Sequence, residues 1–366
     1  MKPRILVWLS GWVDSAVTAY LLQQQGYDVT AGFMINYTTD DEHCTTKADL
    51  AEAQKVADHL GIKLYTFDFQ DAYHERIVRY IVDSYAAGLT PNPDVMCNSL
   101  VKFDLFLEEA LALGFDKVAT GHYARIIPET LPSKEDIGGG NYTWETTTIY
   151  RLLTWVDSNK DQSYFLARLS QLQLQHAMFP LGELTKPEVR QIAQEAQLPN
   201  ADRKDSQGIC FIGKIPMSQF LDQYIPKKTW PIVDSEGRKI GEHEGVRGYT
   251  IGQRKGIKVA HSEPLFVLSK DITTNTLTVG PASSDELFTQ QMHIHDRQWS
   301  AQPYSLPFDG TGMIRYRQTP VRCSLSRVDD TEIYTVTFDD AQRAVASGQI
   351  FVMYDGEKVV GSGVIG

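Results

Sequence analysis

The residues best suited to chemistry near the start of the chain form one short segment, Ser10-Gly11-Trp12-Val13-Asp14-Ser15. The apolar run 5–9 before it predicts a buried strand. Ser10-Gly11 predicts a turn, and Asp14 or Ser15 is suited to cap the helix that follows. At such a helix N-terminus the backbone N–H groups converge and the helix dipole favours negative charge. The segment predicts an anion-binding loop, although alone it equally fits any strand–helix turn of an α/β protein.

Two cysteines lie in loops that contain proline or glycine. Cys97 follows Thr90-Pro91-Asn92-Pro93-Asp94, where two prolines fix the backbone, and we expect Cys97-Asn98 to begin the next helix. A helix N-terminus stabilises a thiolate and so lowers the pKa of a cysteine placed there. Cys210 follows Gly208 in a second loop of small and polar residues. We interpret the two thiols as a reactive pair that meets in the fold, the alternative being two inert, buried cysteines.

The elements that must position these residues alternate between strand and helix. Besides the first strand and helix, the pattern predicts strands at 29–35, 64–67 and 118–120, and helices at 48–60, 73–87 and 98–113. This alternation is typical of a parallel sheet, whose ligands bind at the carboxyl ends of the strands. Those ends carry Ser10-Gly11, Met34 and Gly121-His122, so three strand ends predict one nucleotide pocket.

The second half of the chain has a different pattern. Residues 128–148 predict a mobile loop or a small hairpin, and from residue 232 short strands separated by turns predict all-β modules. We expect an α/β protein with three domains. They are an N-terminal parallel-sheet nucleotide-binding domain of the adenine nucleotide alpha hydrolase type at 1–211, a small, mostly β central domain at 212–281, and a C-terminal β-barrel at 282–366.

Composition limits the class of protein. The 366 residues are 42% hydrophobic and 22% charged, as in ordinary globular proteins. No apolar run approaches the roughly 20 residues needed to span a bilayer, and no secretory signal is evident, so we expect a cytoplasmic protein without a membrane segment. Four cysteines without a Cys-x-x-Cys pair argue against a protein-held metal site, and Cys44 and Cys323 are interpreted as packing residues. A net charge of −11 argues against indiscriminate nucleic-acid binding, but 211–260 holds nine Lys or Arg against five Asp or Glu.

Several motifs in this sequence resemble those of one enzyme family. Ser-Gly-x-x-Asp-Ser resembles the Ser-Gly-Gly-x-Asp-Ser loop of the N-type ATP pyrophosphatases. From residue 4 to residue 365 the chain resembles the tRNA-specific 2-thiouridylases, the MnmA family, which thiolate the wobble uridine (U34) of tRNA. The motifs that carry the resemblance are Thr-Pro-Asn-Pro-Asp-x-x-Cys-Asn, Ala-Thr-Gly-His-Tyr, Lys-Asp-Gln-Ser-Tyr-Phe-Leu, Asp-Ser-x-Gly-Ile-Cys-Phe-Ile-Gly, Gly-Gln-Arg-Lys-Gly and Arg-Tyr-Arg-Gln. Trp12 departs from the family's second glycine, and Ala16 from a frequent second serine.

The resemblance implies a role for each matching residue. The residues implied to bind ATP are Trp8, Leu9, Ser10, Gly11, Trp12, Val13, Asp14, Ser15, Met34 and Gly121. Asn92, Pro93 and Asp94 would contact the target base, with Asp94 as proton donor or acceptor. Cys210 would carry a persulfide, and Cys97 would complete the transfer by forming a disulfide with it. The residues implied to touch tRNA are Lys160, Asp161, Gln162, Arg315 and Tyr316.

The same resemblance implies a tRNA-uridine 2-sulfurtransferase that uses ATP and Mg²⁺. Its partners would be tRNAs with Lys-, Glu- or Gln-type anticodons and a cysteine desulfurase or sulfur-relay protein. Two alternatives stay open at this point. The first is another N-type ATP pyrophosphatase, such as a GMP or argininosuccinate synthetase type, which needs no cysteine pair. The second is a tRNA-binding protein with impaired ATP use, because the Trp12 indole obstructs the approach of phosphate where a glycine would admit it.

Overall fold

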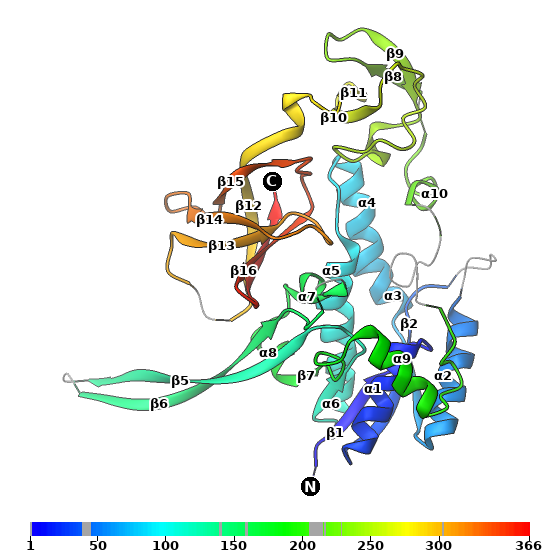
Figure 1. Ribbon diagram of the computed structural model, residues 1–366, viewed down its shortest axis with the longest axis vertical. Coiled ribbons are helices and arrows are strands. Elements are labelled where there is room, and N and C mark those ends of the chain that lie inside the picture. The colour runs from blue at the N-terminus through cyan, green and yellow to red at the C-terminus, as the bar shows by residue number, and fades with distance from the viewer. Residues whose placement is uncertain are drawn as a thin grey trace.

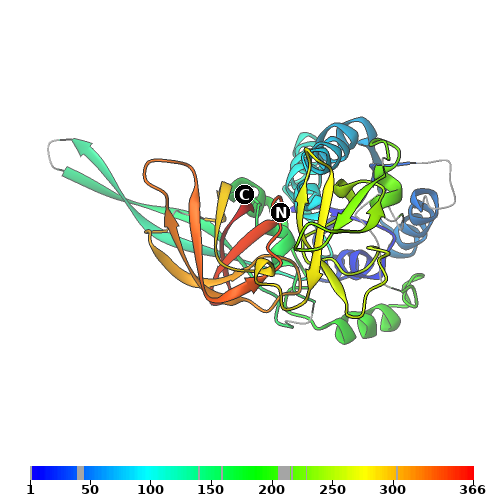
Figure 2. The same cartoon turned by 90° about the horizontal axis from the view of Figure 1, so that it is seen from above.

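The computed structural model describes residues 2–38, 45–138, 141–157, 160–204, 215, 217–227, 229–301 and 304–366. It has an α/β part that contains the N-terminus, a small β module at one end of helix α4, and a C-terminal β-barrel beside the α/β part (Figure 1). A long two-stranded ribbon extends away from the body of the molecule, and it projects in the view from above as well (Figure 2). None of the helices in the described part of the chain combines the length and apolar character needed to cross a bilayer.

The sheet of the α/β part is parallel, as the sequence predicts. Its order in the described residues is β3-β2-β1-β4-β7, and each neighbouring pair runs in the same direction. The strands are β1 (Arg4–Trp8), β2 (Asp28–Ile35), β3 (Leu64–Asp68), β4 (Lys117–Ala119) and β7 (Ala177–Met178). Because β1 is central, the loop that follows it lies in the middle of the carboxyl edge, where ligands of such sheets bind.

Helices cover both faces of this sheet. Side chains alternate along a strand, so Ile5 and Val7 pack in one apolar cluster with helices α1, α2 and α9, while Leu6 packs in another with α4 and α6. The helical segments are α1 (Val13–Gln24), α2 (Thr46–Leu60), α3 (Gln70–Tyr73), η1 (His74–Val78), α4 (Arg79–Ala86), α5 (Pro93–Cys97), η2 (Asn98–Leu105), α6 (Phe106–Ala112), α7 (Ser163–Leu166), α8 (Gln171–His176), α9 (Lys186–Glu195) and α10 (Met217–Leu221).

Local signals explain where some helices begin and end. Gly61 has a φ of +65° and ends α2, as predicted, because an L side chain is strained in that conformation. Thr185 and Glu188 form the capping box that begins α9. The prediction that Asp14 or Ser15 caps α1 is wrong. Trp12 is the N-cap residue and supplies no side-chain hydrogen bond, since both polar residues already lie within the first turn.

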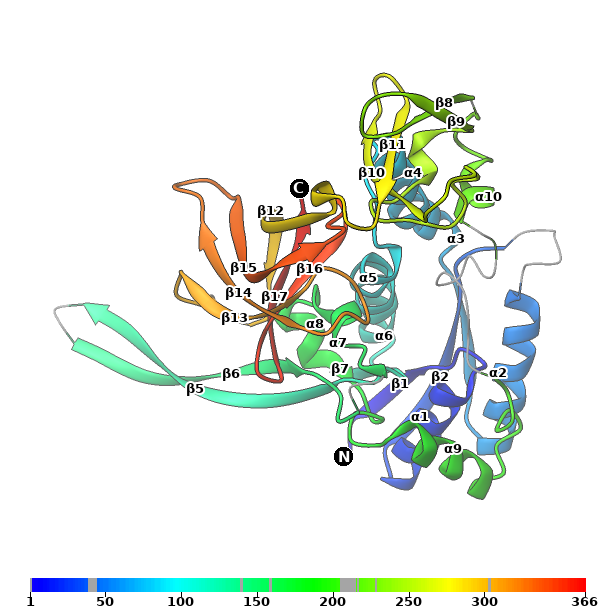
Figure 3. The same cartoon turned by 45° about the horizontal axis from the view of Figure 1, so that its top comes forward.

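The segment predicted as a loop or small hairpin is a long hairpin. Strands β5 (Arg125–Gly138) and β6 (Asn141–Leu153) pair antiparallel over almost their whole length and form the projecting ribbon (Figures 1 and 3). The prolines at 128 and 132 and the glycine at 138 suggested turns. Proline is tolerated in such a ribbon because it cannot donate a backbone hydrogen bond and needs an unpaired edge. Among the described residues, the outer edges of β5 and β6 form no other strand pairing over most of their length.

The all-β prediction for the second half is confirmed. Within the described residues the central module is a sheet of β8 (Trp230–Val233), β9 (Lys239–His243), β10 (Leu265–Asp271) and β11 (Thr276–Pro281), with the short helix η4 (Val246–Gly248). After η5 (Asp285–Leu287) come β12 (Phe288–Trp299), β13 (Phe308–Met313), β14 (Val321–Arg327), β15 (Tyr334–Arg343), β16 (Ile350–Asp355) and β17 (Lys358–Ile365). A pairing of β12 with β17 closes these last strands into a barrel.

Candidate functional site

The predicted anion-binding loop lies at the carboxyl end of β1 and leads into α1. Gly11 has a φ of +81°, and a Cβ atom there would lie 2.4 Å from the carbonyl oxygen of Asp49, so this position requires glycine. The first N–H groups of a helix have no intrahelical acceptor, and within the described residues the N-cap side chain of α1 supplies no capping hydrogen bond. The hydroxyls of Ser10 and Ser15 lie 3.0 Å apart, and Ser15 also donates to the Trp12 carbonyl at 2.9 Å. The loop is therefore rigid, with an uncapped helix N-terminus at its end.

Trp12 lies against an arginine on the outer side of this loop. The Arg203 guanidinium is 3.7 Å from the centroid of the Trp12 ring, and its Nη1 donates to the Gly11 carbonyl at 2.9 Å. Asn200 donates to the same carbonyl at 2.9 Å, and Arg203 also pairs with Asp49. The backbone of Trp12 is extended, with φ −98° and ψ 159°, a conformation open to any residue. Position 12 thus needs no glycine for its backbone angles.

Asp14 has two partners from distant parts of the chain. Its Oδ1 accepts a hydrogen bond from the Tyr123 hydroxyl at 2.7 Å and lies 2.5 Å from the Lys186 ammonium. Tyr123 is fully buried after β4, and Lys186 is the first residue of α9. At Gly121 a Cβ would come within 2.8 Å of the Asp14 backbone, so this glycine lets the end of β4 approach α1. Sequence reasoning singled out Asp14 and Gly121 but missed Lys186, whose only signal was its place in the capping box.

The other residues predicted to bind ATP lie deeper in the α/β part. Leu9 and Val13 are buried, and Met34 is only 1% exposed. Trp8 is partly buried at the end of β1, and the buried Lys102 ammonium lies 4.4 Å from its ring centroid. Met34 belongs to the same apolar cluster as Cys97. The fold therefore brings the predicted nucleotide pocket and one predicted reactive thiol together.

The proline loop forms a helix start, but earlier than predicted. Asn92 caps α5, its Oδ1 accepting from the Val95 N–H at 3.2 Å, and the helix begins at Pro93 and not at Cys97-Asn98. Asp94 therefore lies in the first turn and Cys97 follows one turn later, fully buried. The prediction that Cys97 occupies the helix N-terminus is wrong, because the Asn-Pro pair is itself an N-cap followed by a favoured first residue. Asp94 takes the position nearest the positive end of the dipole instead.

The barrel holds this loop from the other side. The Gln349 side chain donates to the carbonyls of Thr90 at 3.0 Å and Pro91 at 3.2 Å, and accepts from the Asn92 amide at 3.4 Å. The Thr90 N–H donates to the Ser347 carbonyl at 2.8 Å. Nothing in the local sequence pattern indicated that residues so far apart in the chain meet. The barrel therefore forms part of the site, and β16 lies close to α5 and α7 (Figure 3).

The residues predicted to touch tRNA fall in two adjoining loops. Gln162 and Tyr123 exchange two hydrogen bonds of 2.9 Å, one to and one from the Tyr123 backbone. Asp161 accepts from the Trp155 N–H at 2.8 Å and from the Ser163 hydroxyl at 2.6 Å, and its burial raises the pKa of the carboxyl group. Both side chains therefore organise the loop that begins α7. Lys160 is partly exposed, with its ammonium 5.9 Å from the Tyr123 ring centroid.

The second of these loops belongs to the barrel. Tyr316 packs on Phe165 of α7, with ring centroids 4.2 Å apart, while Arg315 is exposed. The Phe165 carbonyl accepts from the Asn98 side chain at 3.2 Å, which connects this loop to the helix that carries Cys97. An exposed cation and an aromatic ring thus lie near the helix that follows the proline loop.

The remaining cysteines test the thiol prediction only in part. Cys210, the loop 205–214 and Cys44 lie outside the described residues. Cys323 is buried inside the barrel, and burial raises its pKa to about 12, which suits a packing role. In the described part of the chain no group of three or more His, Cys, Asp or Glu side chains is arranged to hold a metal ion.

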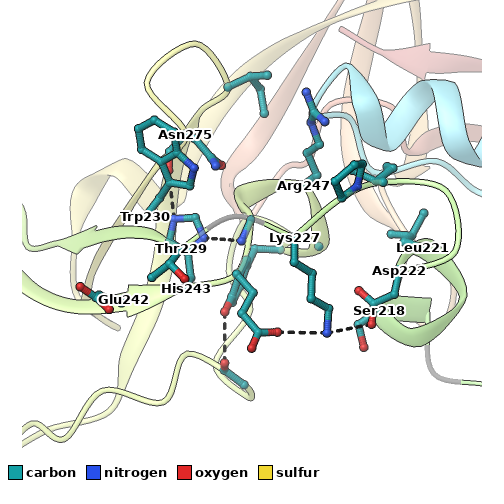
Figure 4. Close-up of a pocket in the computed structure, with 18 of the residues that line it drawn as sticks. Ser218, Leu221, Asp222, Lys227, Thr229, Trp230, Glu242, His243, Arg247 and Asn275 are labelled. Atoms are coloured by element: carbon teal, nitrogen blue, oxygen red, sulfur yellow. Dashed lines mark hydrogen bonds and ion pairs between the residues drawn. The ribbon is translucent and has the colours of Figure 1, made fainter.

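A separate pocket of about 1000 Å³ lies in the central module (Figure 4). The Lys227 ammonium lies 2.9 Å from the Asp222 carboxylate and 3.1 Å from that of Glu244, so one cation is shared by two carboxylates. Arg247 and Lys258 also line the pocket, and neither forms a salt bridge with any residue that the structure describes. The Nε2–H of His243 donates to the Asn275 carbonyl at 3.0 Å, and burial lowers the pKa of His243. The pocket is therefore lined by both basic and acidic side chains, with Arg247 and Lys258 as its basic residues outside those ion pairs.

Comparisons with known proteins agree along the whole chain. Residues 3–214 match the family model described as tRNA methyl transferase HUP domain, 218–281 the tRNA methyl transferase PRC-barrel domain, and 289–365 the Aminomethyltransferase beta-barrel domain. The chain is 44% identical to tRNA-specific 2-thiouridylase MnmA of Ralstonia pickettii, covering all of this chain and 96% of that protein. It is also 44% identical to the MnmA of Thiobacillus denitrificans, covering both chains in full, and 43% identical to that of Enterococcus faecalis, covering 95% of that protein.

Among solved structures, U34-tRNA thiolase NcsA from Methanococcus maripaludis matches with 16% identity and a TM-score of 0.35, covering 61% of this chain and 65% of that one. A likeness this low adds nothing on function. The full-length identities are far above it, and the three matched regions follow the order of the α/β part, the central module and the barrel. The chain therefore belongs to the tRNA-specific 2-thiouridylase (MnmA) family.

Proposed function

We propose that the protein is a tRNA-uridine 2-sulfurtransferase that uses ATP to thiolate the wobble uridine, U34, of tRNA at C2. The observation that carries this proposal is the end-to-end identity with 2-thiouridylases, and the packing of Met34, at the end of β2, in one apolar cluster with Cys97 supports it. A different N-type ATP pyrophosphatase would not be expected to match these relatives over the barrel as well as over the α/β part. The geometry of position 12 also removes the backbone argument against ATP use.

The first step activates a poor electrophile. The uridine O2 attacks the α-phosphorus of ATP, the new O–P bond forms, and the bond from the α-phosphorus to the bridging oxygen breaks to release pyrophosphate. Ser10, Gly11, Val13 and Ser15 would surround the phosphates, since an uncapped helix N-terminus stabilises the charge that grows on the leaving group. Met34 and Gly121 would lie against the adenosine.

The second step transfers sulfur. A persulfide on Cys210 attacks C2 of the adenylated base, and AMP leaves with the former O2. The Cys97 thiolate then attacks the Cys210 sulfur, the S–S bond breaks, and the products are 2-thiouridine and a Cys97–Cys210 disulfide that a thiol reductant reopens. Asp94 in the first turn of α5 would donate or accept the proton of the base, and Asn92 and Pro93 would contact the ring.

The partners follow from this chemistry. Mg²⁺ would be bound in part by the phosphates of ATP, since proteins usually hold this ion through substrate phosphates and one or two carboxylates. We propose a cysteine desulfurase or sulfur-relay protein as the sulfur source, and tRNAs with Lys-, Glu- or Gln-type anticodons as substrates, in the cytoplasm. Lys160, Arg315 and Tyr316 would bind the anticodon arm of the tRNA. Asp161 and Gln162 would hold the conformation of the loop that begins α7. We retain 1–211, 212–281 and 282–366 as the proposed domain limits.

One experiment tests the whole proposal. An unmodified tRNA transcript is incubated with the protein, ATP, Mg²⁺ and a persulfide donor, and its nucleosides are analysed by mass spectrometry. We expect 2-thiouridine with wild-type protein, none with Cys210→Ser or Cys97→Ser, and near-normal amounts with Cys323→Ala as the matched control, because Cys323 is buried in the barrel. ATP consumption without 2-thiouridine, or undiminished product from Cys97→Ser, would contradict the mechanism.

A further inference from the structure

The ion pair between Asp14 and Lys186 joins two helices beside the anion-binding loop. Asp14 is the second residue of α1, and Lys186 is the first residue of α9, so the pair joins the starts of two helices. The Lys186 ammonium lies 2.5 Å from Oδ1 of Asp14, and the two side chains are 19% and 26% exposed. The two side chains are therefore largely shielded from bulk solvent, but part of each remains accessible to a ligand.

A carboxylate at this position is a problem for a phosphate site. Asp14 brings negative charge to the helix N-terminus at which the phosphates of ATP would bind, and like charges there repel. The structure places a cation on that carboxylate, and the buried Tyr123 hydroxyl adds a second donor at 2.7 Å to the same oxygen. Tyr123 therefore keeps the carboxylate oriented even when the ammonium is elsewhere.

Lys186 is also held in place by its surroundings. Its ammonium lies 5.3 Å from the Tyr123 ring centroid, and the capping box of Thr185 and Glu188 fixes the backbone from which the side chain extends. The Trp155 indole donates to the Leu184 carbonyl at 2.8 Å, just before this start of α9. The ammonium is therefore held at the N-terminal end of α1, on the carboxylate of the second residue of that helix.

We infer that Lys186 transfers from Asp14 to the β- and γ-phosphates of bound ATP and stabilises the pyrophosphate as it leaves. Asp14 is then a positioning residue, which binds the Lys186 ammonium beside the anion-binding loop when no nucleotide is present. This rests on the proposed function to the extent that it assumes ATP as substrate. In the adenylation step the charge that develops on the bridging oxygen of pyrophosphate falls next to this ammonium, where its stabilisation matters most.

Binding measurements separate this role from a structural one. For Lys186→Met, calorimetry should show inorganic pyrophosphate bound about 10- to 100-fold more weakly than by wild type, the loss of one charge-assisted hydrogen bond, with AMP binding unchanged. In Asp14→Asn the carboxylate no longer competes with pyrophosphate for the ammonium, so the affinity of this variant for pyrophosphate should equal or exceed that of wild type. Lys186→Arg should restore part of the loss. Lys55→Met, which removes a lysine paired with Glu52 on α2, is the matched control and should leave both ligands unaffected.

The opposite results overturn the inference. If Lys186→Met and Asp14→Asn weaken pyrophosphate binding equally, the pair is a structural brace. If AMP and pyrophosphate weaken together, or neither changes, Lys186 does not contact the leaving group. Thermal unfolding of each variant identifies any loss caused by misfolding, and Asp14→Asn then still distinguishes the two models. None of these readouts depends on thiolation, so the inference and the proposed function can fail separately.

Discussion

Replacing Gln349 tests whether the barrel holds the proline loop in the conformation that the proposed reaction needs. Its amide donates two hydrogen bonds of 3.0 and 3.2 Å to the Thr90 and Pro91 carbonyls, and Thr90 is only 7% exposed. Gln349→Leu removes both donors and leaves acceptors near a buried segment. At about 0.5–1.5 kcal/mol net for each bond, the loss is about 1–3 kcal/mol. The contact at 3.4 Å from Asn92 is too long to add much.

The functional effect should exceed the effect on stability. Asp94 and Cys97 follow directly after the residues that Gln349 holds, and a displacement of about 1 Å in a reacting group can lower a rate about 100-fold. We expect single-turnover thiolation to fall about 10- to 100-fold, while ATP affinity, set by the opposite loop, changes little. Rapid quench followed by nucleoside mass spectrometry measures the rate, and urea unfolding measures the stability.

Two further variants make this prediction strict. Gln349→Glu keeps the size of the side chain but removes both donations and directs negative charge at two carbonyl oxygens, so it should be at least as harmful as leucine. Gln290→Leu removes a single bond of 3.2 Å to the Asp339 carbonyl elsewhere on the barrel and should thiolate normally. A Gln349→Leu protein with a wild-type rate, or a Gln290→Leu protein that is equally slow, would refute the reasoning.

Three other predictions concern the nucleotide loop, tRNA and pH. Trp12→Gly removes the stacking on Arg203, so ATP affinity measured by calorimetry should change less than tenfold; a larger gain would show that the indole obstructs phosphate. Arg315→Ala and Lys160→Ala should each lower the slope of log affinity for tRNA against log salt by about one unit, whereas Arg327→Ala, whose arginine pairs with Glu332, should not. Burial and, secondarily, the Lys102 charge hold the pKa of His122 well below 6.5, so only the unfolded chain takes up this proton as the pH falls below about 6.5. Stability should therefore fall as the pH drops from 7.5 to 5.5, with His122 contributing up to about 1.4 kcal/mol per unit, and His122→Gln should flatten that slope in urea titrations; an unchanged slope would contradict a neutral, buried His122.

Much of the fold could be predicted from local pattern. The alternation of strand and helix, the glycines that end helices and the capping box at Thr185 are local effects, because each depends on residues a few positions apart. The all-β second half followed from short strands separated by turns. The start of α5 was misplaced because the proline loop was treated as irregular, although Asn92-Pro93 is itself a helix-start signal. The ribbon β5–β6 was underestimated because prolines mark turns more often than they occur within long strands.

The sequence by itself predicts which residues carry the chemistry: a loop for anions, two thiols framed by proline or glycine, and an arginine beside a tyrosine. It also determined the family, since long motifs in a fixed order carry that information. Only the tertiary structure decided which residues are in contact with one another. Lys186 pairs with Asp14, 172 residues earlier in the chain, and Gln349 of the barrel donates to the carbonyls of the two residues before Asn92. Such contacts depend on how separate elements pack, and no local pattern of side chains encodes the distance between them.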